Sequence, residues 1–157
     1  MKKEIYKGKY IAVFLEENRG KIRERVYLKD SVNVVLVNNK KNIFLINESR
    51  WENHNRKSVK ILSGLVEENE SPSSCVKREI FEETGISDIR IKKIFTHNKQ
   101  GTINQKKHFY IVYIKNEKDI DLNILCKFSK KKLEEKIKQN YFGLTTTGSL
   151  MRIIAEI

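Results

Sequence analysis

The segment GLVEENESPSSCVKREIFEETGI, residues 64–86, carries both a start signal and a stop signal for a helix. Ser71 has a hydroxyl group that can cap the first turn, and Pro72 suits the first helical position. Gly85 is well placed to end the helix. The apolar side chains within these limits are Cys75, Val76, Ile80 and Phe81. We therefore predict a helix over residues 72–84 that buries this apolar side.

Apolar and β-branched runs on both sides of this helix predict strands. They cover residues 6–14, 21–28, 31–37, 42–47, 59–64, 89–95 and 107–115. Residues 18–20, with the sequence NRG, predict a hairpin turn between the first two runs, and the polar residues 38–41 join the next two. Two further helices are expected over residues 129–140 and 145–157, each starting at a hydroxyl-bearing cap. Since neighbouring hairpins imply antiparallel pairs, this order of elements predicts an α/β fold with a mixed sheet.

The length and composition are those of one globular domain. The chain has 157 residues, of which 39% are hydrophobic, and no linker divides it, so we predict a single domain over residues 1–157. No apolar run approaches the roughly 18 residues of a membrane span, and the basic N-terminus lacks a long apolar region. The two cysteines, Cys75 and Cys126, form no CxxC pair and have no histidine cluster beside them. We therefore expect a cytoplasmic protein whose cysteines are reduced and inert.

The formal net charge is +12, from 32 Lys and Arg residues against 20 Asp and Glu residues. Such a charge attracts anions, including nucleotides and nucleic acids. The basic residues are spread along the chain and are not interleaved with aromatic residues, as they are in grooves that bind single strands. The charge therefore favours an anionic ligand without indicating a nucleic-acid partner.

Three carboxylates lie on one face of the predicted helix. Glu79 and Glu83 are four residues apart, and Glu82 follows Glu79 by three. Three like charges on one face repel each other unless a cation binds them. Glutamate oxygens are hard ligands that suit Mg²⁺ or Mn²⁺, and magnesium commonly joins carboxylates to substrate phosphate oxygens. The face therefore predicts a divalent metal site, and the alternative is a solvated acidic helix face.

The residues before this face can support such a site. Arg78 can reach Glu70, and a bidentate pair between them would tie the preceding loop to the helix. Gly64 lets the backbone bend at the end of a strand, which leaves a carbonyl such as that of Ser63 free to coordinate a metal.

Together these residues match the signature of the Nudix hydrolase family. The match consists of Gly64, five residues, Glu70, seven residues and then the sequence REIFEETGI over residues 78–86. The resemblance implies an α/β/α sandwich around a mixed sheet, and hydrolysis of a nucleoside diphosphate linked to a further group. It also implies metal coordination by the Ser63 carbonyl and by the three carboxylates of the helix, with Arg78 and Glu70 as the supporting pair.

The residue that activates water stays open at this stage. Bound metal ions would neutralise the diphosphate and make water a better nucleophile, and a general base would take its proton. Glu82 can act as that base. In the subset of the family that cleaves ADP-ribose, a glutamate from a later loop does so, and the acids of the corresponding loop here are Glu117, Asp119 and Asp121.

Upstream of the signature the chain resembles the ADP-ribose pyrophosphatases. That resemblance implies an N-terminal hairpin, residues 1–30, that forms a homodimer, and a substrate contact at Arg50. Gly64 and Leu65 are further expected substrate contacts at the end of their strand. The candidates for stacking on a base are Tyr27, Trp51 and Phe95.

Other features differ from the ADP-ribose subset. Lys60 and Leu62 stand where a glutamate and a proline are common, residues 97–105 contain no proline, and the later loop is short. The leading hypothesis remains a Mg²⁺-dependent hydrolase of ADP-ribose, and the alternatives are hydrolysis of RNA 5′ ends or other nucleotides, and a domain that senses a nucleotide without cleaving it. The complete set of signature carboxylates argues against a sensor, which need not keep them all.

Overall fold

A computed structural model of the chain describes residues 1–49, 57–116, 118 and 120–157. Its strands are β1 (Lys2–Lys7), β2 (Ile11–Asn18), β3 (Lys21–Leu28), β4 (Ser31–Val37), β5 (Ile43–Ser49), β6 (Lys57–Lys60), β7 (Leu62–Leu65), β8 (Ile89–Lys99), β9 (Ile103–Ile114) and β10 (Leu125–Phe128). Its helices are α1 (Pro72–Thr84), α2 (Lys130–Lys138) and α3 (Leu144–Ile154).

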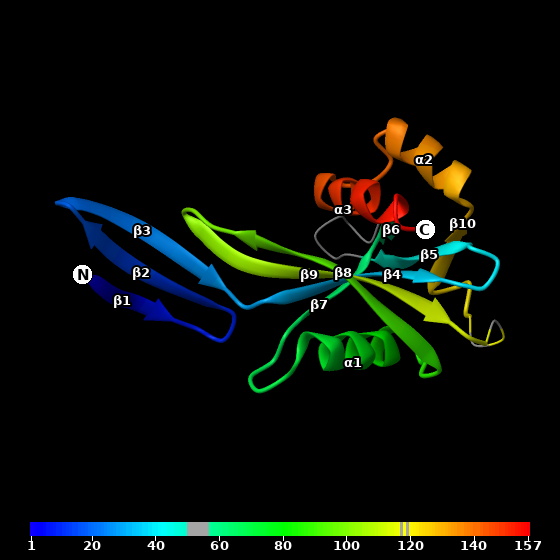
Figure 1. The fold of residues 1–157 in the computed structure, drawn as a ribbon, viewed down its shortest axis with the longest axis horizontal. Helices are drawn as coiled ribbons and strands as arrows, with labels where there is room; N and C mark the ends of the chain where they lie inside the picture. Colours follow the sequence, from blue (N-terminus) through cyan, green and yellow to red (C-terminus); the bar gives the residue numbers. More distant parts are fainter. Residues whose placement is uncertain (50–56, 117, 119) are drawn as a thin grey trace.

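The strands form a mixed sheet with helices on both of its faces. The order of hydrogen-bonded strands is β1-β2-β3-β9-β4-β5-β10, and β7, β6 and β8 pair with β4, β5 and β9 respectively. Strand β4 runs parallel to β9 and antiparallel to β5 and β7. Helix α1 lies on one side of this sheet, and α2 and α3 lie on the other (Figure 1). The predicted α/β/α sandwich around a mixed sheet is therefore confirmed.

Strand β4 is buried along its whole length and separates two hydrophobic clusters. Val32, Val34 and Leu36 pack in the cluster that includes the α1 side chains Val76 and Ile80. Val35 and Val37 pack in the cluster that includes the buried residues of α2 and α3, which are Leu133, Leu150, Ile153 and Ile154. Because successive side chains of a strand point to opposite faces, β4 is the central strand between the two helical layers.

Helix α1 has the limits that the sequence predicted. The Ser71 side chain accepts a hydrogen bond from the backbone N–H of Ser74, and Gly85 ends the helix with a φ of 71°. The buried residues of α1 are Cys75, Val76 and Ile80. Phe81 is 60% exposed, so its assignment to the buried side was wrong. It follows Ile80 by one residue, a rotation of about 100° around the helix, which takes its side chain off the buried face.

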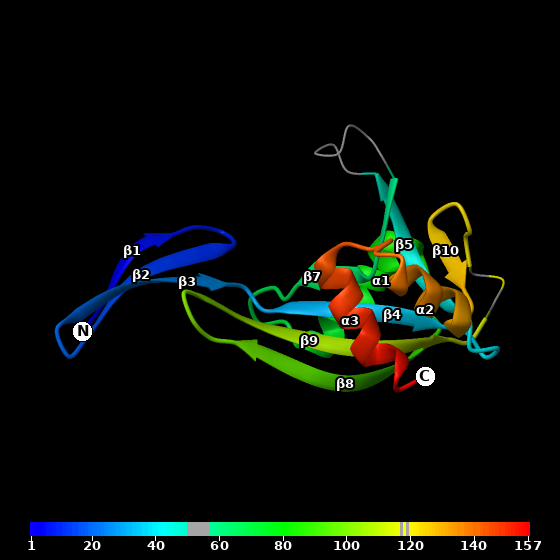
Figure 2. The same ribbon diagram turned by 90° about the horizontal axis from the view of Figure 1, so that it is seen from above.

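The N-terminal residues form three antiparallel strands that project from the sandwich (Figure 2). Strands β2 and β3 are joined by Arg19 and Gly20, which both have positive φ, as a type I′ hairpin turn requires. The predicted hairpin is thus present. The expected strand over residues 6–14 is instead divided by a turn, in which Gly8 N–H donates to the Ile11 carbonyl. Tyr6 and Lys7 of that segment belong to β1, which adds a third strand.

Other elements differ from the expectation in their limits. The run at residues 59–64 is divided between β6 and β7, which pair with different strands. Strands β8 and β9 extend further than predicted into a long hairpin, and β10 was not predicted. Helix α2 has the expected serine cap at Ser129, whereas α3 begins after Gly143 and has no side-chain cap. In the part of the chain that the structure describes, no helix is long and apolar enough to cross a membrane.

Candidate functional site

Arg78 on α1 joins the strand, the loop and the helix of the signature segment. Its Nε and Nη2 donate to the two carboxylate oxygens of Glu70, both at 3.0 Å, which forms the predicted bidentate pair. Its Nη1 donates to Glu79 Oε1 at 2.8 Å and to Glu82 Oε2 at 3.1 Å. Nη2 also donates to the Leu65 carbonyl at 3.1 Å. One guanidinium group therefore fixes the loop and orients two of the three helix carboxylates.

The loop between β7 and α1 is also braced by Glu70. The backbone N–H of Glu67 donates to Glu70 Oε2 at 3.0 Å. The hydrogen bonds from Arg78 hold the pKa of Glu70 below its usual value, in spite of the opposing effect of burial. Glu70 therefore stays ionised and keeps this loop closed on the helix.

Glu79 lies directly against the backbone of β7. Its side chain is 13% exposed, and a Cβ atom added at Gly64 would overlap the Glu79 carboxyl group. Burial raises the pKa of Glu79, and the neighbouring charges of Glu82 and Glu70 add to this effect, while Arg78 lowers it. The glycine of the signature is thus required for the close approach of a carboxylate to the strand that carries Ser63.

Glu83 lies one turn further along α1, in a different environment. Burial is the main cause that raises its pKa, and the positive charge of Lys60 is the main opposing cause. Lys60 in turn forms an ion pair with Glu48, with Nζ and Oε2 2.8 Å apart. Glu83 is therefore associated with a cation from β6, whereas Glu79 and Glu82 are associated with Arg78.

In the conformation of the described residues, no group of three or more His, Cys, Asp or Glu side chains is gathered as a metal site. The reason is visible in the contacts, since Arg78 binds two of the helix carboxylates and the third lies near Lys60. The residues nevertheless fit a divalent ion. Their donors are hard carboxylate oxygens on one helix face, and two of these groups, Glu79 and Glu83, are ionised less readily because of burial and mutual repulsion. A bound cation would relieve both effects, and Glu82 can turn toward it because its side chain is 55% exposed.

A family model described as NUDIX domain matches residues 27–138, from the end of β3 to the end of α2. The chain belongs to the Nudix family. A comparison with curated proteins finds no match. As a member of this family, the chain is a pyrophosphohydrolase that acts on nucleoside diphosphate derivatives, and Nudix hydrolases generally use a divalent metal such as Mg²⁺.

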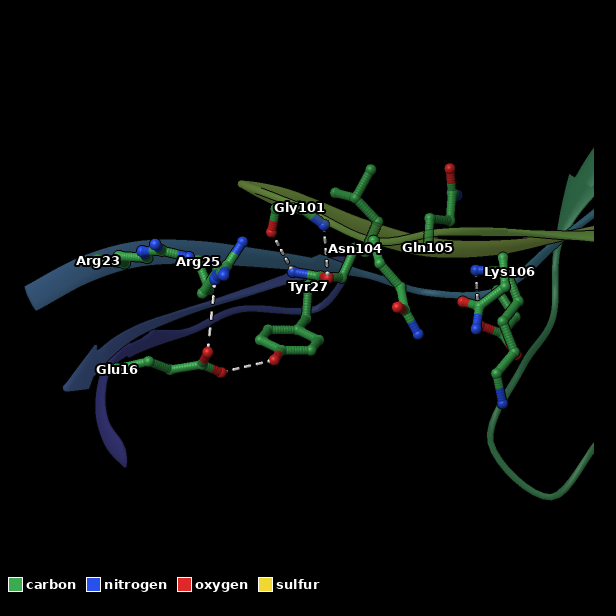
Figure 3. A pocket seen from close by; sticks show the side chains of 12 residues that line it. Glu16, Arg23, Arg25, Tyr27, Gly101, Asn104, Gln105 and Lys106 are labelled. Atoms are coloured by element: carbon green, nitrogen blue, oxygen red, sulfur yellow. Dashed lines mark hydrogen bonds and ion pairs between the residues drawn. The ribbon is translucent and has the colours of Figure 1, made fainter. Parts of the chain in front are cut away.

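A polar cleft of about 660 Å³ lies between the N-terminal strands and the tip of the β8–β9 hairpin (Figure 3). Arg23, Arg25 and Lys106 bring positive charge to it. Glu16 Oε1 accepts a hydrogen bond from the Tyr27 hydroxyl at 2.7 Å, and Glu16 Oε2 forms an ion pair with Arg25 Nε at 3.4 Å. The cleft is large enough for part of a nucleotide, and nothing in the sequence patterns indicated it, because its two walls come from distant segments.

Asp30 connects this cleft with the signature segment. Its side chain lines the cleft, and its carbonyl accepts a hydrogen bond from the backbone N–H of Val66 at 2.9 Å. Val66 follows Leu65, whose carbonyl binds Arg78. One end of the cleft therefore adjoins the loop that leads into α1.

The aromatic candidates lie apart from the helix carboxylates. Tyr27 packs edge-on against Phe14 within the N-terminal strands and lines the cleft. Phe95 stacks on Phe109, with ring centroids 4.3 Å apart, in the cluster under α2 and α3. Phe95 is therefore on the opposite face of the sheet from α1. Trp51 lies outside the described residues.

The structure describes only some of the candidates for substrate contact and for the general base. Arg50, Glu117 and Asp119 also lie outside the described residues. The Asp121 carboxylate accepts hydrogen bonds from the backbone N–H of Asn123, at 2.8 Å, and from its side-chain Nδ2, at 2.9 Å. These hydrogen bonds stabilise the loop that contains Asp121.

Sequence reasoning did not find the pairing of Glu48 with Lys60. The replacement of a common glutamate by Lys60 was the available signal. Its meaning depends on the pairing of β5 with β6, which the sequence patterns do not specify.

Proposed function

We propose that this Nudix protein is a Mg²⁺-dependent hydrolase that cleaves ADP-ribose to AMP and ribose 5-phosphate. The observation that carries the proposal is the position of Arg78, which binds Glu70, Glu79 and Glu82 at once and so arranges the signature carboxylates. A solvated acidic face would not need a glycine beneath one carboxylate or a bidentate brace beside it. A nucleotide sensor without catalysis is therefore less well supported than an enzyme.

The side chains of α1 would bind the metal and thereby orient the diphosphate. When bound, divalent ions neutralise the diphosphate oxygens and lower the pKa of coordinated water. Glu79, Glu82 and Glu83, with the Ser63 carbonyl, would donate oxygen ligands to these ions. Arg78 would keep Glu79 in place through Nη1 while its other nitrogens hold Glu70 and Leu65.

Glu82 is the general base that the described residues support best. Its carboxylate is exposed and lies between Glu79 and Glu83 on the helix, so it can receive a proton from water at the metal site. Glu117 and Asp119 remain alternatives. Asp121 is a weaker one because its carboxylate already accepts two hydrogen bonds.

The polar cleft is the proposed binding site for the nucleoside end of the substrate. Its arginines and Lys106 suit the charge of a nucleotide, and Asp30 brings it next to the signature loop. The same positive charge would also suit the 5′ end of an RNA, which is the second candidate substrate. The cytoplasm is the proposed location, and the two free cysteines are consistent with a reducing compartment.

The first prediction concerns the metal carboxylates. Glu83→Gln should lower kcat by about 1000-fold, because the loss of one anionic ligand removes several kcal/mol of charge stabilisation. The fold should be unchanged by circular dichroism, since Gln has the same shape. Glu135→Gln, on the exposed surface of α2, is the control and should keep full activity. Equal turnover by Glu83→Gln and the wild type would refute the assignment of the site.

The substrate is tested with a panel in the presence of Mg²⁺. It contains ADP-ribose, other nucleotide sugars, dinucleoside polyphosphates, nucleoside triphosphates and RNA with a 5′-triphosphate. We expect the highest kcat/KM for ADP-ribose. A much higher value for the RNA would select the second candidate, and no turnover of any compound would favour a sensor.

A further inference from the structure

Lys60 projects toward the same face of the sheet as α1. Val59, which precedes it on β6, and Ile61, which joins β6 to β7, pack in the cluster under α2 and α3, whereas Leu62 at the start of β7 packs in the cluster under α1. Since side chains alternate between the two faces of a strand, Lys60 must point to the α1 side, with Leu62 and Gly64. Gly64 already lies beneath Glu79.

Glu48 reaches the same place from the adjacent strand. Ile46 packs in the α1 cluster, and Glu48 follows it by two residues on β5, so both side chains point to this face. Ile46 is the register partner of Lys60, and the Glu48 carboxylate forms its ion pair with Lys60 at 2.8 Å. Glu83 of α1 is close enough for the charge of Lys60 to lower its pKa and for that of Glu48 to raise it, so the ammonium group acts on a second carboxylate.

Lys60 is largely removed from solvent, and Glu48 is partly buried. The Lys60 side chain is 16% exposed and that of Glu48 is 35% exposed. Burial of a carboxylate without a counter-charge is costly, so Glu48 and Glu83 together require a cation at this position. Lys60 provides one from within the chain, and its charge would repel a second cation in the same place.

We propose that Lys60 is a resident cation of the catalytic centre, which occupies the position between Glu48 and Glu83 that a divalent ion could otherwise take. The inference rests on the proposed metal site at α1 and deepens it. Lys60 is a positioning residue, because it acts through Glu83. As a consequence, the wild-type site binds one divalent ion fewer than its carboxylates could hold.

The test counts Mn²⁺ ions bound per chain, by calorimetric titration and by the electron paramagnetic resonance signal of free Mn²⁺, without substrate. Lys60→Met should bind one Mn²⁺ more than the wild type, and Lys60→Gln provides a second variant if the first does not fold. The double variant Glu48→Gln/Lys60→Met should lose this additional ion. Lys115→Met, which removes a lysine from an exposed pair with Asp88, should bind the same number as the wild type.

An unchanged number of Mn²⁺ ions in both folded Lys60 variants would overturn the inference, whatever their affinity. An additional ion that persists in the double variant would overturn it as well, because that ion would not depend on Glu48. Neither result would affect the proposed hydrolase, which depends on turnover of the substrate panel and on Glu83→Gln. A wild type without turnover that still shows the additional ion in Lys60→Met would refute the hydrolase alone.

Discussion

At the scale of single residues, the site depends on close contact between α1 and the backbone of β7. Arg78 and Glu79 are adjacent on the helix and both reach the strand, one at the Leu65 carbonyl and the other at Gly64. The same helical turn buries Cys75, whose pKa rises to about 12 because of burial. Its Sγ lies 3.4 Å from the Leu65 carbonyl, so it acts as a packed, unreactive side chain.

Gly64→Ala should reduce activity by more than it reduces stability. The added methyl group would displace the Glu79 carboxylate, and a displacement of about 1 Å at a catalytic group can cost about 100-fold in rate. The overpacking itself should lower the free energy of unfolding by about 2 kcal/mol. Steady-state kinetics and urea denaturation measure the two effects separately.

Gly148→Ala is the control for this substitution. Gly148 lies within α3, and a Cβ atom there would meet open space. Alanine should therefore raise the free energy of unfolding by up to about 1 kcal/mol and leave kcat unchanged. If Gly64→Ala kept wild-type kcat, the close approach of Glu79 to the strand would have no importance for catalysis.

At the scale of elements, the sequence predicted those structures whose signals are local. Helix α1 is bounded by Ser71 and Gly85, which act through contacts within one turn, so its limits were predicted correctly. The turn at Gly8 was missed because a single glycine is a weak turn signal in a segment that has β-branched or aromatic residues on both sides of it. Strand β10 was missed because its conformation depends on pairing with the distant β5.

In the candidate site, too, the contacts within the signature segment could be predicted, whereas those between distant segments could not. Helix periodicity was sufficient to place the three glutamates on one face, and the bidentate geometry of arginine and carboxylate predicted the pair of Arg78 with Glu70. The Glu48–Lys60 pair depends on strand register, and the cleft depends on the junction of β3 with β9. Neither relationship is encoded by spacing along the chain, which is why only the structure reveals them.

Strand β9 contains a buried histidine that should make stability depend on pH. His108 is 8% exposed, and its Nδ1 is hydrogen bonded to Thr96 Oγ1 at 3.0 Å. Burial is the main cause that lowers its pKa below 6.5; Lys93 and Lys106 also lower it, while Asp30, 3.7 Å away, raises it. The unfolded chain therefore takes up this proton first as the pH falls.

The consequence is that the contribution of His108 to stability is complete above pH 6.5 and is lost as the pH falls toward its lower folded-state pKa. We expect the Tm of the wild type to fall between about pH 7.5 and about pH 5.5 by more than that of His108→Gln. His97→Gln, at an exposed position on β8, is the control and should retain the wild-type dependence. An equal pH dependence in His108→Gln would exclude this histidine as the cause.

At the scale of the whole molecule, the three N-terminal strands have one face that lines the cleft and one face that is rich in apolar side chains. The strand pairing places Glu16, Arg23, Arg25 and Tyr27 on one face, which lines the cleft (Figure 3). The register places Ile11, Val13, Leu15, Ile22 and Val26 on the other face, together with Glu17 and Glu24. None of these five apolar residues belongs to either hydrophobic cluster of the sandwich, and Ile22 is 70% exposed. A partly exposed face rich in apolar side chains supports the proposed homodimer through residues 1–30.

Ile22→Glu should convert the dimer to a monomer, because it would bury a charge in the proposed apolar interface. The adjacent residue on β3 offers a matched control, since Lys21 points to the opposite face. Lys21→Glu introduces the same side chain at an exposed site and should leave the dimer intact. Light scattering during size-exclusion chromatography gives the mass of each variant against a chain mass of 18.5 kDa. A wild type that elutes as a monomer at all concentrations, or an Ile22→Glu variant that remains dimeric, would remove this face from the dimer interface.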